Sequence, residues 1–95
     1  MQRLENNCDE VCALLKALSH PGRLLILGHL VAGEKTVTEL QEMCGISQSQ
    51  LSQFLARMRF EGLVRGERRG RSIFYSTGDD RVAWLIRAIQ ALYSR

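Results

Sequence analysis

Residues 36–71 read TVTELQEMCGISQSQLSQFLARMRFEGLVRGERRGR, and this stretch predicts four structural parts in order. A short helix with apolar residues at helical spacing comes first, and a tight turn follows at Cys44-Gly45-Ile46-Ser47. Ser47 is placed to cap a second helix, rich in Ser and Gln, that extends to about Phe60. Two short strands joined by Arg69-Gly70-Arg71 then predict a hairpin. This order of parts is that of a winged helix-turn-helix.

The residues on either side of this stretch predict three more helices. Ser19 is placed to cap the second of them, because Pro21 then falls in the first helical turn. Gly33 fits at the end of the same helix. We therefore expect a mainly α fold with a small β-hairpin, arranged as four helices, two strands and a final helix, in one domain over residues 1–95. The expected bounds are 7–18, 19–33 and 79 or 80 to the C-terminus for these helices, and 63–68 and 72–77 for the strands.

Apolar residues at helical spacing identify the helix faces that should be buried. In the helix that Thr36 or Thr38 can cap, the inward residues should be Val37, Leu40 and Met43. In the helix that follows Ser47, they should be Leu51, Leu55 and Met58, with Phe54 between them.

The positive charge is unevenly distributed along the chain. The net charge of the chain is +3. Residues 57–71 contain six arginines and two glutamates and so carry +4, while the rest of the chain sums to −1. A local basic stripe is typical of a protein that binds a polyanion, yet a run of charges also occurs on an ordinary solvated face. Charge alone leaves both interpretations open.

The helix that follows Ser47 carries short hydrogen-bonding side chains on its outward face. A helix that lies in the major groove of DNA needs such side chains, because Gln pairs bidentately with adenine, Arg with guanine and Ser with either. A helix face that is only solvated more often carries Glu and Lys pairs. The pattern therefore favours DNA recognition, through Gln48, Ser49, Ser52, Gln53 and Arg57.

The hairpin brings cationic side chains to its tip. Arg68, Arg69 and Arg71 surround Gly70 and could reach the DNA backbone. Contacts to phosphate position a protein on DNA without reading its sequence. The alternative is an arginine-decorated hairpin that packs on nothing.

The last helix has an apolar stripe that is wide for so small a domain. We expect it to pack, with the first helix, against a second copy of the chain across a two-fold axis. Burial within one copy is the alternative. The residues expected at the interface are Val82, Leu85 and Ile89, with Trp84 and Tyr93 as aromatic anchors.

Two strings resemble the ArsR/SmtB family of bacterial winged-helix repressors: LLKALSHPGRLLILGHL at 14–30 and ISQSQLSQFLARMRFEGLVRGERRGRSIFYS at 46–76. The resemblance is closest to the HlyU/BigR-like branch, which has LLKAMSHP-type and LSQHLARMR-type strings, and it extends from about Cys12 to Tyr93. It implies a homodimer with the first and last helices at the interface and the Ser- and Gln-rich helix in the major groove. Phe54 departs from the family, which often has His there.

The resemblance also indicates where metal-sensing relatives bind their ions. One pattern is a Cys-x-Cys at positions that match Thr36 and Thr38, which are poor ligands for a soft ion. The other uses Asp and His on the last helix, which has no His here. We therefore expect no metal site of either type and no cofactor.

The resemblance to the HlyU/BigR-like branch implies a thiol switch made of two cysteines. Their positions match Gly28 and Ser94 here. That pair is missing from this chain. Cys8 and Cys12, four residues apart, leave a thiol response open, and the alternative is two small apolar residues on a helix.

Composition and motifs exclude several classes of protein. The chain has no apolar run long enough to span a bilayer, acidic residues interrupt its start, and its three cysteines do not suggest a disulfide framework, so a cytoplasmic location is expected. It shows no catalytic set of an enzyme. We predict a homodimeric repressor that binds a palindromic operator in double-stranded DNA, with an unidentified inducer. The alternatives are a metal-responsive repressor with a non-standard site and a winged helix used only for protein contacts.

Overall fold

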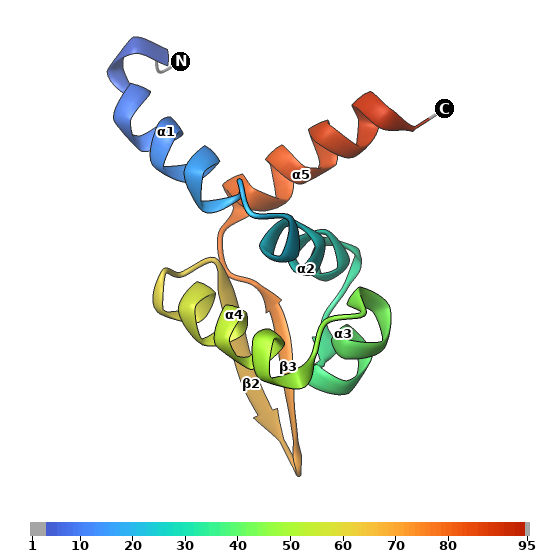
Figure 1. Cartoon of the computed structure of the whole chain (residues 1–95). Coiled ribbons are helices and arrows are strands. Elements are labelled where there is room, and N and C mark those ends of the chain that lie inside the picture. Colours follow the sequence, from blue (N-terminus) through green and yellow to red (C-terminus); the bar gives the residue numbers. More distant parts are fainter. Residues whose placement is uncertain (1–3, 95) are drawn as a thin grey trace.

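The computed structural model describes residues 4–94, and its elements follow the predicted order (Figure 1). The mainly α winged helix-turn-helix fold is therefore confirmed. After a single 3-10 turn at Leu4–Asn6, the elements are α1 (Cys8–Ala17), α2 (Pro21–Ala32), β1 (Lys35–Thr36), α3 (Val37–Cys44), α4 (Gln48–Phe60), β2 (Val64–Arg69), β3 (Ser72–Thr77) and α5 (Asp80–Tyr93).

The sheet has three strands rather than the predicted two. Its order is β1-β3-β2, and both neighbouring pairs are antiparallel. Phe74 on the central strand pairs with Thr36 on one side and Glu67 on the other. The missed strand, β1, has only two residues between two helices, which is too short for an alternating pattern to reveal it.

The helix caps explain why the helix-turn-helix begins and turns where it does. Thr36 and Glu39 form a capping box, since the Glu39 N–H donates to Thr36 Oγ1 at 3.2 Å and the Thr36 N–H donates to Glu39 Oε1 at 2.8 Å. Gly45 ends α3 with a φ of +66°, a left-handed conformation that favours glycine. Ser47 then caps α4, as predicted, because its Oγ accepts from the Gln50 N–H at 3.2 Å.

The cap of α2 differs from the prediction. His20, not Ser19, is the capping residue, because its Nδ1 accepts a hydrogen bond from the Gly22 N–H at 3.0 Å. The Ser19 hydroxyl instead donates to the Lys16 carbonyl oxygen at 2.7 Å, which places it at the end of α1. Histidine is an uncommon capping residue, so the usual preference for serine pointed one position too early.

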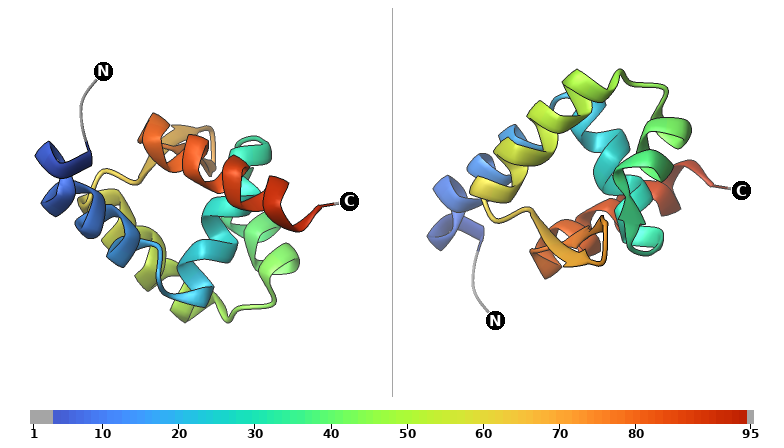
Figure 2. Two further views of the ribbon diagram at one scale, coloured as in Figure 1. Left: turned by 90° about the horizontal axis from the view of Figure 1, so that it is seen from above. Right: turned by 90° about the horizontal axis from the view of Figure 1, so that it is seen from below.

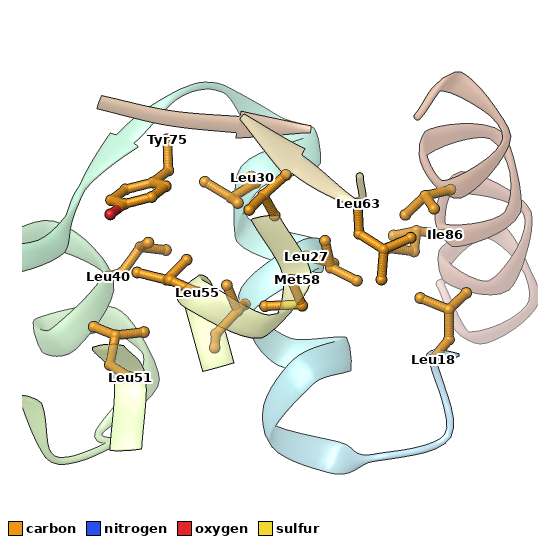
Figure 3. Close-up of a cluster of buried hydrophobic side chains, with 13 residues drawn as sticks. Leu18, Leu27, Leu30, Leu40, Leu51, Leu55, Met58, Leu63, Tyr75 and Ile86 are labelled. Atoms are coloured by element: carbon orange, nitrogen blue, oxygen red, sulfur yellow. The ribbon is translucent and has the colours of Figure 1, made fainter. Parts of the chain in front are cut away.

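One face of α4 is buried in the core, as predicted (Figure 3). Leu51, Leu55 and Met58 pack with residues from α2, α3, β3 and α5, and none of the three is more than 2% exposed. On α3, Leu40 is fully buried but Met43 is 50% exposed, so the prediction for Met43 was wrong. The short α3 turns Leu40 to the core, and Cys44, one residue beyond Met43, packs against the cluster instead.

Helices α1 and α5 extend away from the body, at the end opposite the hairpin tip (Figure 1). Helix α1 meets α2 at a bend of 95°. Within residues 4–94, no single helix has the length and apolar character needed to cross a membrane, and only the bent α1–α2 pair meets these criteria jointly. Leu15 on α1 and Trp84, Leu92 and Tyr93 on α5 are exposed.

The burial of α5 corrects one predicted interface residue. Val82 is fully buried inside the chain's own core, as is most of Ile86 one turn later. The start of α5 runs beside the sheet and α2, and Val82 therefore anchors the helix to the body rather than facing a second copy.

The contrast between Leu40 and Met43 is testable. Changing Leu40 to Ala should lower the free energy of unfolding by about 2–5 kcal/mol, because it leaves a cavity between α3 and the core. Changing Met43 to Ala should cost less than about 1 kcal/mol, since half of its side chain already faces solvent. Urea denaturation followed by circular dichroism measures both, and equal destabilisation by the two changes would contradict this placement of α3.

Candidate nucleic-acid interface

The predicted base-reading side chains lie on the exposed side of α4. Gln48, Ser49, Ser52, Gln53 and Arg57 are all exposed, and Ser49, Gln53 and Arg57, spaced four apart, share the helix face that points away from the buried leucines. Burial of Leu51 and Leu55 sets this orientation, because residues three and four apart share a helix face. The arrangement leaves a continuous row of hydrogen-bonding groups facing solvent.

Helix α4 and the hairpin lie at the same end of the molecule, remote from both chain ends (Figures 1 and 2). The helix packs against β2, so the two candidate DNA-binding elements have a set position relative to one another. This combination of an exposed polar helix and an adjacent hairpin suits one continuous surface, such as a groove and its flanking phosphates.

Arg57 on α4 shares a carboxylate with a second arginine. Its Nε donates to Glu61 Oε2 at 3.0 Å, while the guanidinium of Arg23 on α2 binds Glu61 Oε1. Hydrogen bonding from Arg23, then from Arg57, outweighs desolvation and lowers the pKa of Glu61 below its ordinary value of 4.5. The Arg57 side chain remains 70% exposed, so it is held by Glu61 yet accessible to a ligand.

The hairpin tip is tighter than predicted. Strand β2 includes Arg69, and the turn consists of Gly70 and Arg71 alone, with Gly70 at a φ of +61°. Arg68 and Arg71 are exposed and, within residues 4–94, neither forms an ion pair. These two side chains are therefore accessible to a ligand.

Arg69 differs from its neighbours in a way that the sequence did not reveal. Its guanidinium binds Glu34 through Nη1 at 2.6 Å and Nη2 at 2.9 Å, and binds Glu67 through Nη2 at 2.6 Å. It also lies over the Phe74 ring, with Cζ 4.7 Å from the ring centroid. Glu34 is 35 residues away in the sequence, so no local pattern could have indicated this contact.

Phe54 faces the body of the domain. Its ring lies 5.0 Å from the ring of His20, the residue that caps α2. A Cβ atom at Gly22 would come within 2.9 Å of Phe54 Cε2, so glycine there lets the ring lie against the start of α2. Phe54 therefore connects α4 to α2, a role that the sequence left undefined.

The cysteines are all free thiols. Cys8 and Cys12 are exposed on α1, and Cys44 is partly buried, which raises the pKa of its thiol. Within residues 4–94, no group of three His, Cys, Asp or Glu side chains is placed to hold a metal ion. In an intact helix, residues four apart have Cβ atoms about 5–6 Å apart, too far for the roughly 3.8 Å of a relaxed disulfide. The thiol response of Cys8 and Cys12 stays a prediction.

Residues of α2 and α5 line a mostly apolar groove of about 560 Å³. Gly28, one of the two positions that match the thiol switch of the HlyU/BigR-like branch, lies in it. A Cβ atom there would come no closer than 4.0 Å to Gln90 Nε2, so the groove is open above this residue. The other lining residues are Pro21, Leu24, Leu25, His29, Ala32, Ile86 and Ile89.

Comparisons with known proteins agree with this geometry. A family model described as "Bacterial regulatory protein, arsR family" matches residues 20–65. The biofilm growth-associated repressor of Xylella fastidiosa is 40% identical over 90 residues, which cover 95% of this chain and 79% of the relative. The transcriptional activator HlyU of Vibrio cholerae is 37% identical over 93 residues, which cover 98% and 86%.

Solved structures share the whole fold. The crystal structure of the transcriptional repressor BigR from Xylella fastidiosa matches with a TM-score of 0.91 and 39% identity, over 100% of this chain and 99% of that one. A homodimeric winged helix-turn-helix DNA-binding domain from Mycobacterium bovis matches with a TM-score of 0.76 and 29% identity, over 97% and 85%.

The fold and its exposed polar helix define a winged helix-turn-helix transcriptional regulator that binds DNA. Within that class, the chain belongs to the ArsR family, and its similarity to HlyU and BigR confirms the predicted branch. The names of the family and of these relatives are those of transcription regulators rather than enzymes.

The Glu61 ion pairs should make stability depend on pH. Because the folded-state pKa of Glu61 is lowered, the stabilisation is complete above the unfolded-state pKa and disappears as the pH falls through the folded-state pKa. The advantage of the wild type over Glu61→Gln in unfolding free energy should therefore shrink as the pH falls from about 5 to about 3. Urea titrations at each pH measure it.

Glu42→Gln is a suitable control, since Glu42 is exposed and forms no ion pair within residues 4–94. A pH-independent difference between the wild type and Glu61→Gln would show that the Arg23–Glu61–Arg57 contacts add nothing to stability.

Proposed function

We propose that the protein is a homodimeric repressor that binds a palindromic operator and blocks transcription by occupying it. The observation that supports this most directly is the exposed row of Ser, Gln and Arg side chains on α4, beside a hairpin whose Arg68 and Arg71 form no ion pair within residues 4–94. As a bacterial DNA-binding regulator, it would act in the cytoplasm, where the chromosome lies.

In this proposal α4 lies in the major groove and the hairpin reaches the backbone. Gln48 and Gln53 suit adenine, Arg57 suits guanine, and the serines suit either base or a phosphate. Arg57 would exchange its exposed bond with Glu61 for a base edge, at little cost because the pair is already in contact with water. Arg68 and Arg71 would bind phosphate, which adds affinity without sequence preference.

A two-fold dimer would supply the second recognition helix. Leu15 on α1 and Leu92 on α5 are exposed in a single chain, and Trp84 and Tyr93 are 74% and 85% exposed. Aromatic side chains with such exposure are typical of a protein interface. The homodimeric domain from Mycobacterium bovis supports a two-fold arrangement, and a palindromic operator would match that symmetry.

The relatives are named both for repression and for activation, so the direction of regulation needs its own experiment. An in vitro transcription assay with the operator placed over a promoter tests it. A repressor lowers transcript yield in proportion to the occupied fraction of the operator, whereas an activator raises it. Absence of binding to any duplex DNA would instead favour a winged helix used only for protein contacts.

The two types of DNA contact predict different effects of mutation. Gln53→Ala and Arg57→Ala should each weaken operator binding by about 1–3 kcal/mol and relax base preference, with little effect on random DNA. Arg71→Ala should weaken binding to the operator and to random DNA about equally. Fluorescence anisotropy with both duplexes measures this, and equal weakening on both duplexes by Gln53→Ala would contradict its role in base reading.

The proposed interface is tested by the oligomeric state. Replacing Trp84 and Leu92 together by Ser should convert a dimer to a monomer in sedimentation equilibrium, because both side chains are exposed and apolar in one chain. Arg87→Ser, an exposed polar position on the same helix, is the control and should stay dimeric. A monomeric wild type would disprove the interface.

A further inference from the structure

We infer that Arg69 does not bind DNA but is a positioning residue, which holds the hairpin against the turn between α2 and β1 through Glu34. The inference rests on the proposed DNA-binding function, because the position of the hairpin matters to binding only if the hairpin contacts DNA phosphates. It separates Arg69 from Arg68 and Arg71, which the sequence pattern groups together.

The strand register places the partners of Arg69 on one face of the sheet. Directly paired residues on antiparallel strands share a face, so Thr36, Phe74 and Glu67 lie in one row across the three strands. Side chains two apart on a strand point the same way, which adds Arg69 on β2. Arg69 therefore lies over the central strand and reaches the Glu34 carboxylate beyond its far side.

The opposite face of the sheet is the one that packs against α4. Tyr75 is buried there, and its register partner Gly66 has the Arg59 side chain of α4 within 3.1 Å of where a Cβ would be. Arg68 pairs with Ile73 and shares this face. Arg68 thus lies on the α4 side of the hairpin, while Arg69 lies on the side away from the recognition helix.

The contacts of Arg69 use most of its hydrogen-bonding capacity. Nη1 and Nη2 bind the two oxygens of Glu34, a bidentate geometry, while Nη2 and Nε bind Glu67 Oε1 at 2.6 and 3.2 Å. Stacking on Phe74 adds a cation–π contact. A phosphate would compete with two carboxylates for this guanidinium, whereas Arg71 forms no ion pair within residues 4–94.

This cluster connects the hairpin to the start of the helix-turn-helix. Glu34 lies two residues before Thr36, the residue that caps α3. Single exposed ion pairs contribute little, but here one ordered guanidinium serves two carboxylates and a ring, so its ordering cost is shared. The hydrogen bond from Arg69 also lowers the pKa of Glu34.

The inference predicts an effect opposite to simple electrostatics. Removing a negative charge from a DNA-binding protein ordinarily strengthens its binding to DNA. Glu34→Gln should instead weaken operator binding by about two- to fivefold, because the hairpin is no longer anchored. Glu42→Gln, the same change at an exposed position without an ion pair within residues 4–94, should leave binding unchanged or strengthen it.

Salt dependence separates positioning from direct binding of phosphate. Removing one side chain that neutralises a phosphate should reduce the slope of log K against log salt by roughly 0.9. Arg71→Ala should show this reduction, whereas Arg69→Ala should weaken binding with the slope unchanged. Glu34→Gln should have no further effect in the Arg69→Ala background. A reduced slope for Arg69→Ala, or operator binding by Glu34→Gln that matches or exceeds the wild type, would overturn the inference.

A measurement without DNA keeps the inference separate from the proposed function. Hydrogen exchange of the backbone amides in β2 and β3 should be faster in Glu34→Gln and Arg69→Ala than in the wild type, and unchanged in Glu42→Gln. Unchanged exchange in all variants overturns the positioning role even if the protein binds its operator. If exchange is faster in these two variants but the wild type binds no duplex DNA, the positioning contact is supported and the proposed function is rejected.

Discussion

The burial of Leu51, Leu55 and Met58 determines how the rest of the molecule is presented. These three side chains fix the rotation of α4 about its own axis, so the Ser, Gln and Arg side chains face solvent. Phe54 adds a second restraint by packing against His20 at the start of α2. The orientation of this exposed polar surface is thus a consequence of core packing.

Carboxylates arrange the arginines around this surface. Glu61 binds Arg57 at the end of α4, and Glu34 binds Arg69 on the side of the hairpin away from α4, while Arg68 and Arg71 are without an ion pair within residues 4–94. The basic stretch at 57–71 therefore contains arginines of different kinds: some are oriented by an acid, and others are available to a polyanion. A count of charges does not distinguish these two kinds of arginine, but the side chains around them do.

Most features governed by local chemistry could be predicted from the sequence, although the cap of α2 is His20 rather than Ser19, and features that depend on distant residues could not. The caps at Thr36 and Ser47, the turn at Gly45 and the buried stripe of α4 follow from spacing within a few residues. The contact between Arg69 and Glu34 joins residues 35 apart, and the burial of Val82 depends on how α5 meets the body. The same limit applies to strand β1, whose two residues pair only with β3.

The placement of α1 and α5 at the end opposite the hairpin tip has a consequence for how such regulators diversify. In the proposed dimer, the separation between the two α4 helices is set by the way the terminal helices cross, not by α4 itself. The number of base pairs between operator half-sites would then depend on α1 and α5. The preferred bases within each half-site would depend on α4. In the proposed dimer, spacing and sequence preference would therefore be separate traits, and evolution could alter either one while preserving the other.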